Sequence, residues 1–121
     1  MKYLLLIYHD EAAFSALTEP EREQVYVEYR KLRERLNTGG QFIDGSQLQA
    51  TATAASVRIR DGKELVTDGP FAETHEQLGG YFLIDVDSDA EAVAVAKQIP
   101  SARTGTVEVR PLVESAAEAN A

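Results

Sequence analysis

The sequence DGPFAETHEQLGGYFLIDV at residues 68–86 joins a turn, a polar loop and an apolar run, and it decides how the chain folds. Gly69 and Pro70 predict a bend, because glycine tolerates positive φ and proline restricts both its own φ and the residue before it. Asp68 is typical of a turn residue that accepts hydrogen bonds from nearby amides. We expect the Phe71 ring to be buried and to anchor this turn to the core.

Two apolar runs without alternation predict strands that are buried on both faces, at residues 81–84 and at residues 2–8. Residues 56–60 and 106–113 instead alternate polar and apolar side chains, as strands with one wet face do. Asp61-Gly62 predicts a two-residue hairpin between residues 56–60 and 63–67, and Phe42-Ile43 is a candidate short strand.

Two helices separate these strands. Thr18 and Glu21 form a capping box, an apolar stripe follows at helical spacing, and Gly39-Gly40 ends the helix. The charged side chains of this helix are interpreted as a solvated face. A second capping pattern begins at Ser88, and Pro100 ends that helix.

The order of these elements predicts an α+β fold, the ferredoxin-like βαββαβ arrangement with an added hairpin. In that arrangement the two strands without alternation are central and the two alternating strands lie at the edges. Both helices cover one face of the sheet, so something else must cover the second apolar face. A homodimer that packs sheet to sheet would do so, as would a bound apolar ligand or the folded-back hairpin.

Composition narrows the function classes. The 121 residues suit one domain, with residues 114–121 as an extended or frayed tail. A net charge of −8 gives no support for nucleic-acid binding, and the absence of cysteine excludes thiol chemistry and disulfides. No run is long enough for a signal peptide or a membrane span, so we expect a cytoplasmic protein. No cofactor motif occurs, and none is predicted.

The antiparallel order of the central strands places the end of the first near the start of the third, and candidate site residues gather at this predicted rim. An imidazole titrates near neutrality, so His9 or His75 is a candidate base and Asp68 or Glu76 a candidate carboxylate to orient it. The alternative is an ordinary solvated surface. Glu73, His75 and Glu76 lack a second pair of ligands, so no metal site is predicted. The remaining candidates for the rim or pocket are Tyr8, Gly69, Pro70, Phe71, Gly79, Gly80 and Arg103.

Several motifs in order carry a family resemblance over nearly the whole chain. MKYLLLIY at the start, DGPFAET and EQLGGYFLIDV in the centre, IPSA after the second helix and GTVEVRPL near the end resemble the DGPF-type branch of the YCII-related family. The resemblance covers residues 1–113. It implies a subunit that dimerises through its sheet as a dimeric α/β barrel. It also implies a bacterial protein of a family whose DGPF members are often encoded beside sigma factors of the extracytoplasmic-function type.

The resemblance leaves two functions open. One is a small dimeric binding or accessory protein whose pocket lies between the helices and the sheet, with a small organic ligand or a protein of a sigma-factor pathway as partner. The other is a lyase, isomerase or dehydrochlorinase type of enzyme, since related YCII proteins include a dehydrochlorinase for which a His-Asp pair is the proposed catalytic site. The sequence departs from that pair: no histidine occurs between Thr18 and Gly40, and Ile99 stands where the aspartate would precede Pro100.

Overall fold

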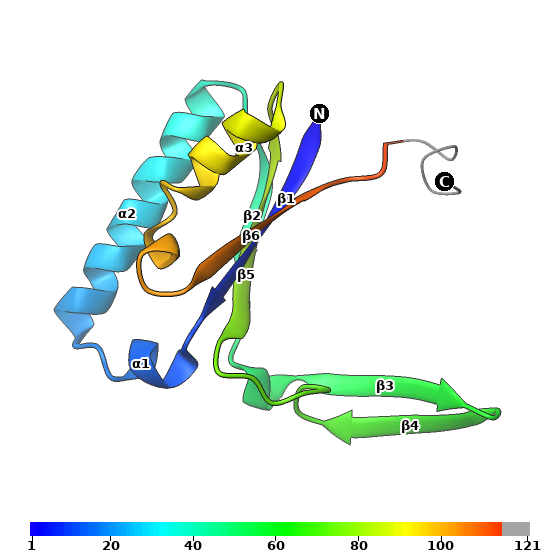
Figure 1. Ribbon diagram of the computed structural model, residues 1–121. Helices are drawn as coiled ribbons and strands as arrows, with labels where there is room; N and C mark the ends of the chain where they lie inside the picture. The colour runs from blue at the N-terminus through cyan, green and yellow to red at the C-terminus, as the bar shows by residue number, and fades with distance from the viewer. Residues whose placement is uncertain (115–121) are drawn as a thin grey trace.

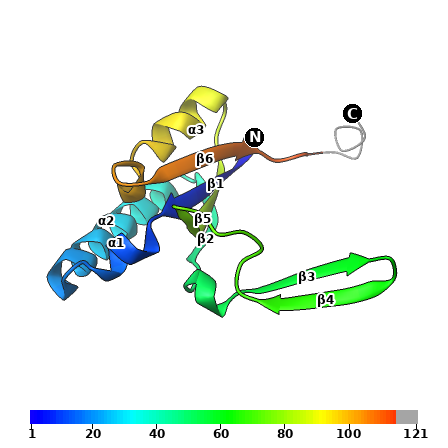
Figure 2. The ribbon, with the colours of Figure 1, turned by 60° about the horizontal axis from the view of Figure 1, so that its bottom comes forward.

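The computed structural model describes residues 1–114 and has an α+β fold with a four-stranded antiparallel sheet, an extra hairpin and three helices (Figures 1 and 2). The elements are β1 (Lys2–His9), α1 (Glu11–Ser15), α2 (Glu19–Thr38), β2 (Phe42–Gln47), β3 (Ala55–Arg60), β4 (Lys63–Asp68), β5 (Gln77–Asp85), α3 (Asp89–Ala96) and β6 (Thr106–Pro111), with single 3₁₀ turns at Thr51–Thr53 and Pro100–Ala102. Nearly all of the tail expected at residues 114–121 lies outside the described residues.

The main sheet has the strand order β2-β5-β1-β6, with every neighbouring pair antiparallel. The two apolar runs are therefore central, as predicted. One edge assignment was wrong, because the second edge strand is β2 and not the alternating residues 56–60. Those residues form β3, which pairs with β4 in a separate two-stranded sheet.

The core lies between the sheet and the helices α2 and α3, which cover one face (Figure 1). Tyr3 and Leu5 of β1, Leu32 of α2 and Ile99 after α3 are completely or almost completely buried there. The capping box of α2 is present as predicted: Thr18 accepts a hydrogen bond from the Glu21 amide, and the Glu21 carboxylate accepts one from the Thr18 amide. These bonds satisfy amides that the first helical turn leaves unpaired.

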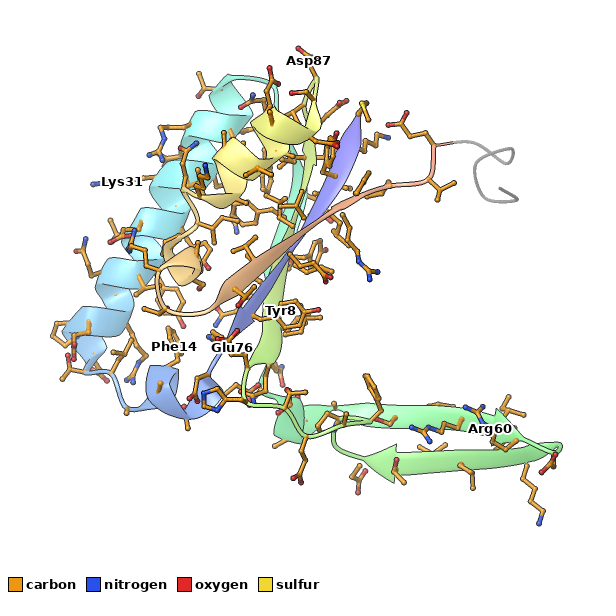
Figure 3. All side chains as sticks on the ribbon, viewed as in Figure 1. Tyr8, Phe14, Lys31, Arg60, Glu76 and Asp87 are labelled. Carbon is orange, nitrogen blue, oxygen red and sulfur yellow. The ribbon has the colours of Figure 1, made fainter. Side chains whose placement is uncertain are left out.

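The expectation that both central strands are buried on two faces was wrong for the single chain. Burial alternates along β1 and β5, because only the helix-covered face is closed. The other face carries half-buried side chains, and we call it the open face; its central residues are Leu4, Leu6, Tyr8, Tyr81 and Leu83. Figure 3 shows Tyr8 on this face and Phe14 on the helix side.

The hairpin β3–β4, which we call the arm, projects from the body on the side opposite to the helices (Figures 1 and 2). Its turn is the predicted one, since Asp61 and Gly62 both have positive φ, as a type I′ turn requires. Val57, Ile59 and Val66 share one face of the arm and are each at least 63% exposed. A two-stranded hairpin with an uncovered apolar face is marginally stable in water by itself.

The DGPF segment follows the arm. Gly69 has φ of 92°, which only glycine adopts easily, and its amide donates to the Ala54 carbonyl at 2.6 Å. The hydroxyl of Ser56 donates to the Gly69 carbonyl at 2.8 Å. The turn was therefore predicted correctly, but the burial of Phe71 was not, because this ring is 80% exposed. The bend is held at the base of the arm by these two hydrogen bonds, one from the Gly69 amide and one from the Ser56 hydroxyl, and the Phe71 ring does not anchor it.

Among residues 1–114, no helix combines the length and the apolar character that crossing a membrane requires.

Candidate functional site

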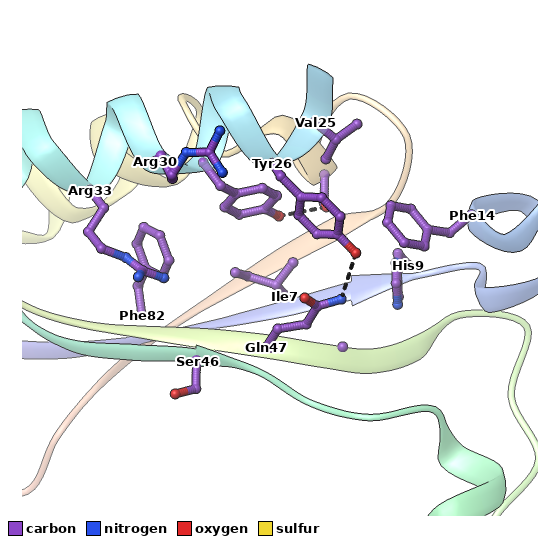
Figure 4. Close-up of a pocket in the computed structure, with 14 residues that line it drawn as sticks. Ile7, His9, Phe14, Val25, Tyr26, Arg30, Arg33, Ser46, Gln47 and Phe82 are labelled. Carbon is purple, nitrogen blue, oxygen red and sulfur yellow. Dashed lines mark hydrogen bonds between the residues drawn. The ribbon is translucent and has the colours of Figure 1, made fainter. Parts of the chain in front are cut away.

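A pocket of about 220 Å³ lies between α2 and the covered face of the sheet (Figure 4). Aromatic and apolar side chains form most of its wall, and a few polar groups point into it. The lining includes Ile7, His9, Phe14, Tyr26, Tyr29, Arg30, Arg33, Gln47, Gly79, Gly80, Phe82 and Ser101. A mostly apolar wall with a few convergent polar groups is typical of small-molecule sites.

His9 occupies one end of the pocket. It is the last residue of β1, and a register shift between Ile7 and Tyr8 precedes it. The imidazole lies against the Phe14 ring, with 5.4 Å between the ring centroids. Gly79 of β5 leaves the space that this imidazole fills, because a Cβ atom there would lie 2.5 Å from Nε2 of His9.

The short helix α1 brings Phe14 to the same end. The Asp10 carboxylate caps α1 by accepting a hydrogen bond from the Ala13 amide at 3.1 Å. The Glu11 amide donates to Oε1 of Gln77 at 2.9 Å, which ties the start of α1 to the start of β5. Phe14 also contacts Tyr26 edge to face, with 6.1 Å between centroids, so α1 and α2 close this end together.

Two tyrosines of α2 supply hydroxyl groups. Tyr29 shares a 2.7 Å hydrogen bond with Ser101, and burial raises the pKa of its phenol above the ordinary value. Tyr26 is also half-buried, and its hydroxyl accepts a long hydrogen bond of 3.4 Å from the Gln47 amide nitrogen. That bond spans the pocket between α2 and β2 (Figure 4), so its opening would widen access.

Two arginines of α2 line the opposite end of the pocket. The guanidinium of Arg33 lies over the rings of Phe42 and Phe82, at 5.5 and 5.9 Å from their centroids. Arg30 forms an exposed ion pair with Glu23 at 3.2 Å. The pocket therefore has the two arginines at one end and the His9 imidazole at the other, with a wall of aromatic side chains between them.

The structure brings only part of the predicted rim into this pocket. His9, Gly79 and Gly80 line the pocket, whereas the Tyr8 side chain lies on the open face of the sheet. One predicted partner of the histidines, Glu76, instead accepts a 2.9 Å hydrogen bond from the Thr106 hydroxyl.

The remaining candidates lie away from the pocket lining. Arg103 pairs with Glu28 of α2 at 2.6 Å, and Asp68 ends β4 in the arm. Glu73 and His75 are exposed in the loop before β5, as is Pro70 after Gly69. In the described part of the chain, no hydrogen bond, ion pair or ring contact joins either histidine to Asp68, Glu73 or Glu76, and no three acidic or histidine side chains gather as metal ligands.

Sequence reasoning did not predict which residues form the helical half of the site. Arg30 and Arg33 were assigned to a solvated face of α2, Tyr26 was assigned no role, and α1 with Phe14 was not predicted. One signal was present: Tyr26, Arg30 and Arg33 recur at spacings of four and three, which places them on one helix face beside the apolar stripe.

Comparisons with known proteins place this architecture in a family. The sequence matches the YCII-related domain over residues 1–116. It is 40% identical to an uncharacterized protein from Rhizobium meliloti (strain 1021) over 114 residues, which cover 93% of this chain and 92% of that protein. Both matches cover the sheet, the helices and the arm together. The chain therefore belongs to the YCII-related family.

Proposed function

We propose that this protein binds a small organic molecule in the pocket between α2 and the sheet. The observation that carries this proposal is the wall of that pocket, where Phe14, Tyr26, Tyr29 and Phe82 surround about 220 Å³ of space. Core side chains normally fill such a space at close-packed density. Here it could hold about seven waters at about 30 Å³ each, enough for a small ring and its substituents.

Native mass spectrometry tests this function directly. The protein purified from its own host is expected to carry a defined small molecule that mild heating releases. A protein that is always empty, and whose Tyr26 and Tyr29 signals in a nuclear magnetic resonance spectrum respond to no added aromatic compound, would contradict the proposal.

We also propose that the subunit forms a homodimer through its open face, the arrangement of a dimeric α/β barrel. Three leucines at the centre of that face, Leu4, Leu6 and Leu83, are only half-buried in the single chain. The arm projects to the same side as this face, so a second copy stacked there would lie beside the arm (Figure 1). Covering both surfaces at once would offset the exposure of Val57 and Val66.

A charge placed in this interface tests the dimer. Leu83→Arg is expected to shift the sedimentation mass towards the 13.3 kDa of one chain, because an unpaired buried charge strongly disfavours association. Val93→Arg is the matched control, since Val93 is 41% exposed on α3 in the helix layer. A monomeric parent protein at micromolar concentration, or equal masses for both variants, would contradict this interface.

The position of His9 supports a second function, acid-base catalysis on the bound molecule. Its imidazole is half-buried at one end of the pocket, while His75 lies in an exposed loop. A base must reach the proton that it removes, and His9 meets this condition for a ligand in the pocket. If turnover of any such ligand is found, His9→Gln is expected to abolish it and His75→Gln to retain it; equal rates in parent and His9→Gln protein would exclude this mechanism.

The DGPFAET motif supports placing the chain in the DGPF-type branch of its family, and with it a protein partner from a sigma-factor pathway. Stoichiometric recovery of such a protein on affinity purification from the native host would support this partner. Repeated recovery of the bare protein would count against it.

A further inference from the structure

The charges of the pocket are opposite in sign to those of the whole chain. The protein has 20 acidic and 12 basic residues and a net charge of −8. Nevertheless, the charged side chains lining the pocket are Arg30 and Arg33, and none of the acidic residues within the described range 1–114 lines it. A local positive field in an acidic protein favours an anionic ligand over a neutral or cationic one.

Arg33 is the more available of these two cations. Arg30 is engaged by Glu23, but Arg33 has no carboxylate within ion-pair distance among the described residues. Its guanidinium is held instead over Phe42 and Phe82 by cation-π contacts. A guanidinium held over aromatic rings in this way keeps its N–H donors available, and a carboxylate can accept two of them in bidentate fashion.

The surface next to Arg33 is aromatic. Tyr29 contacts Phe82 edge to face, with 6.1 Å between centroids and 70° between planes, and the Phe14–Tyr26 pair has similar geometry. Ile7 lies between these two pairs on the sheet side (Figure 4). A flat apolar ring can pack against such a wall, while His9 at the far end can hydrogen-bond a polar substituent.

From these contacts we infer that the ligand is a small aromatic carboxylate, with its carboxylate on Arg33 and its ring between α2 and Ile7. The assignment rests on the proposed binding function and adds the ligand class. Arg33 is exposed, so water screens the ion pair and the ring contributes much of the affinity. Binding is therefore expected to require both the ring and the negative charge.

Titration of the full-length protein with four probes tests the inference. Benzoate carries both features, benzamide keeps the ring without the charge, acetate keeps the charge without the ring, and benzylamine reverses the charge. Benzoate is expected to bind at least several times more tightly than each of the others, and to weaken as salt is raised. Calorimetry gives the affinities, and resonances of Tyr26 and His9 report whether the probe is in the pocket.

A matched pair of variants assigns the charge. Arg33→Gln is expected to weaken benzoate about tenfold, the loss expected for a charge-assisted hydrogen bond, and to leave benzamide unchanged. Arg58→Gln removes the same charge from the exposed arm and is expected to change neither. Equal binding of benzoate and benzamide, or equal losses in both variants, would overturn the anionic ligand class while the pocket function stands. If none of the four probes perturbs the pocket, the aromatic carboxylate class is overturned, and native mass spectrometry of the protein from its own host decides the pocket function separately.

Discussion

The His9 imidazole fills the space where a side chain at Gly79 would lie, across the central strands β1 and β5. A Cβ atom at Gly79 would be 2.5 Å from Nε2 and 2.7 Å from Cδ2 of His9. The residue at position 79 therefore determines where His9, the only histidine in the described pocket lining, can place its imidazole. The neighbouring glycine has a different role. A Cβ atom at Gly80 would meet the backbone carbonyl of Ser46 at 2.9 Å, in the paired strand β2.

Gly79→Ala is expected to expel the imidazole from the pocket at little cost in stability, since the end of a side chain can rotate away for about 1 kcal/mol. Gly80→Ala is expected to cost more, about 1–3 kcal/mol, because a strand must shift. Chemical denaturation measures both. In a His9→Ala background the penalty of Gly79→Ala should vanish, and a penalty that is unchanged there would contradict the proposed conflict.

The two histidines are expected to respond differently to a ligand. The sequence has only these two, so their imidazole proton resonances can be assigned by His9→Gln and His75→Gln. Benzoate is expected to shift the His9 signals and leave those of His75 in place, because only His9 lines the pocket. A shift confined to His75 would move the binding site to the loop before β5.

Removal of the capping side chain of α2 is expected to destabilise the protein. Thr18→Ala deletes the acceptor of the Glu21 amide and should cost about 1 kcal/mol in thermal or denaturant unfolding. Thr38→Ala makes the same chemical change at the other end of α2, where no cap is lost, and should be close to neutral. Equal effects of the two variants would contradict a specific role of the capping box.

The same box predicts part of the acid response. Hydrogen bonds from Thr18 lower the pKa of Glu21 below its ordinary value of 4.5. A carboxyl whose pKa is lowered in the folded state stabilises the protein at pH values above the ordinary pKa. This contribution is lost as the pH falls through the lowered pKa. The Thr18 amide is the main donor, so stability measured from neutral to acidic pH should decline less steeply in Glu21→Gln, which lacks the titrating carboxyl, than in the parent.

Alkaline titration is expected to single out Tyr3 among the five tyrosines. Its phenol donates to the Asp89 carboxylate at the start of α3, and this bond, with burial, raises the pKa of Tyr3 to about 12. The contribution to stability is full below the ordinary pKa of 10.0 and is lost as the pH rises towards about 12. Asp89→Asn should bring the last phenolate absorbance step to lower pH, whereas Tyr29→Phe should leave that step in place.

Much of the fold follows from local sequence. Apolar runs that lack alternation gave the central strands, and Thr18 with Glu21 gave the start of α2. The edge strand β2 was predicted only as the short strand Phe42-Ile43, because Asp44-Gly45-Ser46 has the composition of a turn. Gly45 is nevertheless required in the strand, since a Cβ atom there would lie 2.9 Å from the Phe82 ring. Alternation at residues 56–60 predicted a strand correctly but could not say with which sheet it pairs, since any two-faced strand shows that pattern.

The site was harder to predict for a related reason. The antiparallel central pair placed His9 beside Gly79 and Gly80, because strand order fixes which ends meet. The rotation of α2 on the sheet, which turns Tyr26, Arg30 and Arg33 towards the pocket, depends on packing that periodicity does not encode. Charged residues at helical spacing look alike whether they face water or rim a cavity.

The arm is inserted between two chain segments, at the end of β2 and the start of β5, that pair with each other at its base. Gln47 pairs with Gly80, and the Leu48 amide donates to the Gly79 carbonyl at 2.8 Å, so the chain leaves and rejoins the sheet at nearly one point. Insertions of this kind can change length and sequence over evolution without altering the register of the host strands. The DGPF motif, the most recognisable in the chain, begins at the last residue of the arm, where the chain returns to the sheet. Its residues are expected to stay in place when the arm changes in length, because the Gly69 amide closes the base of the arm on the Ala54 carbonyl and its φ of 92° favours glycine.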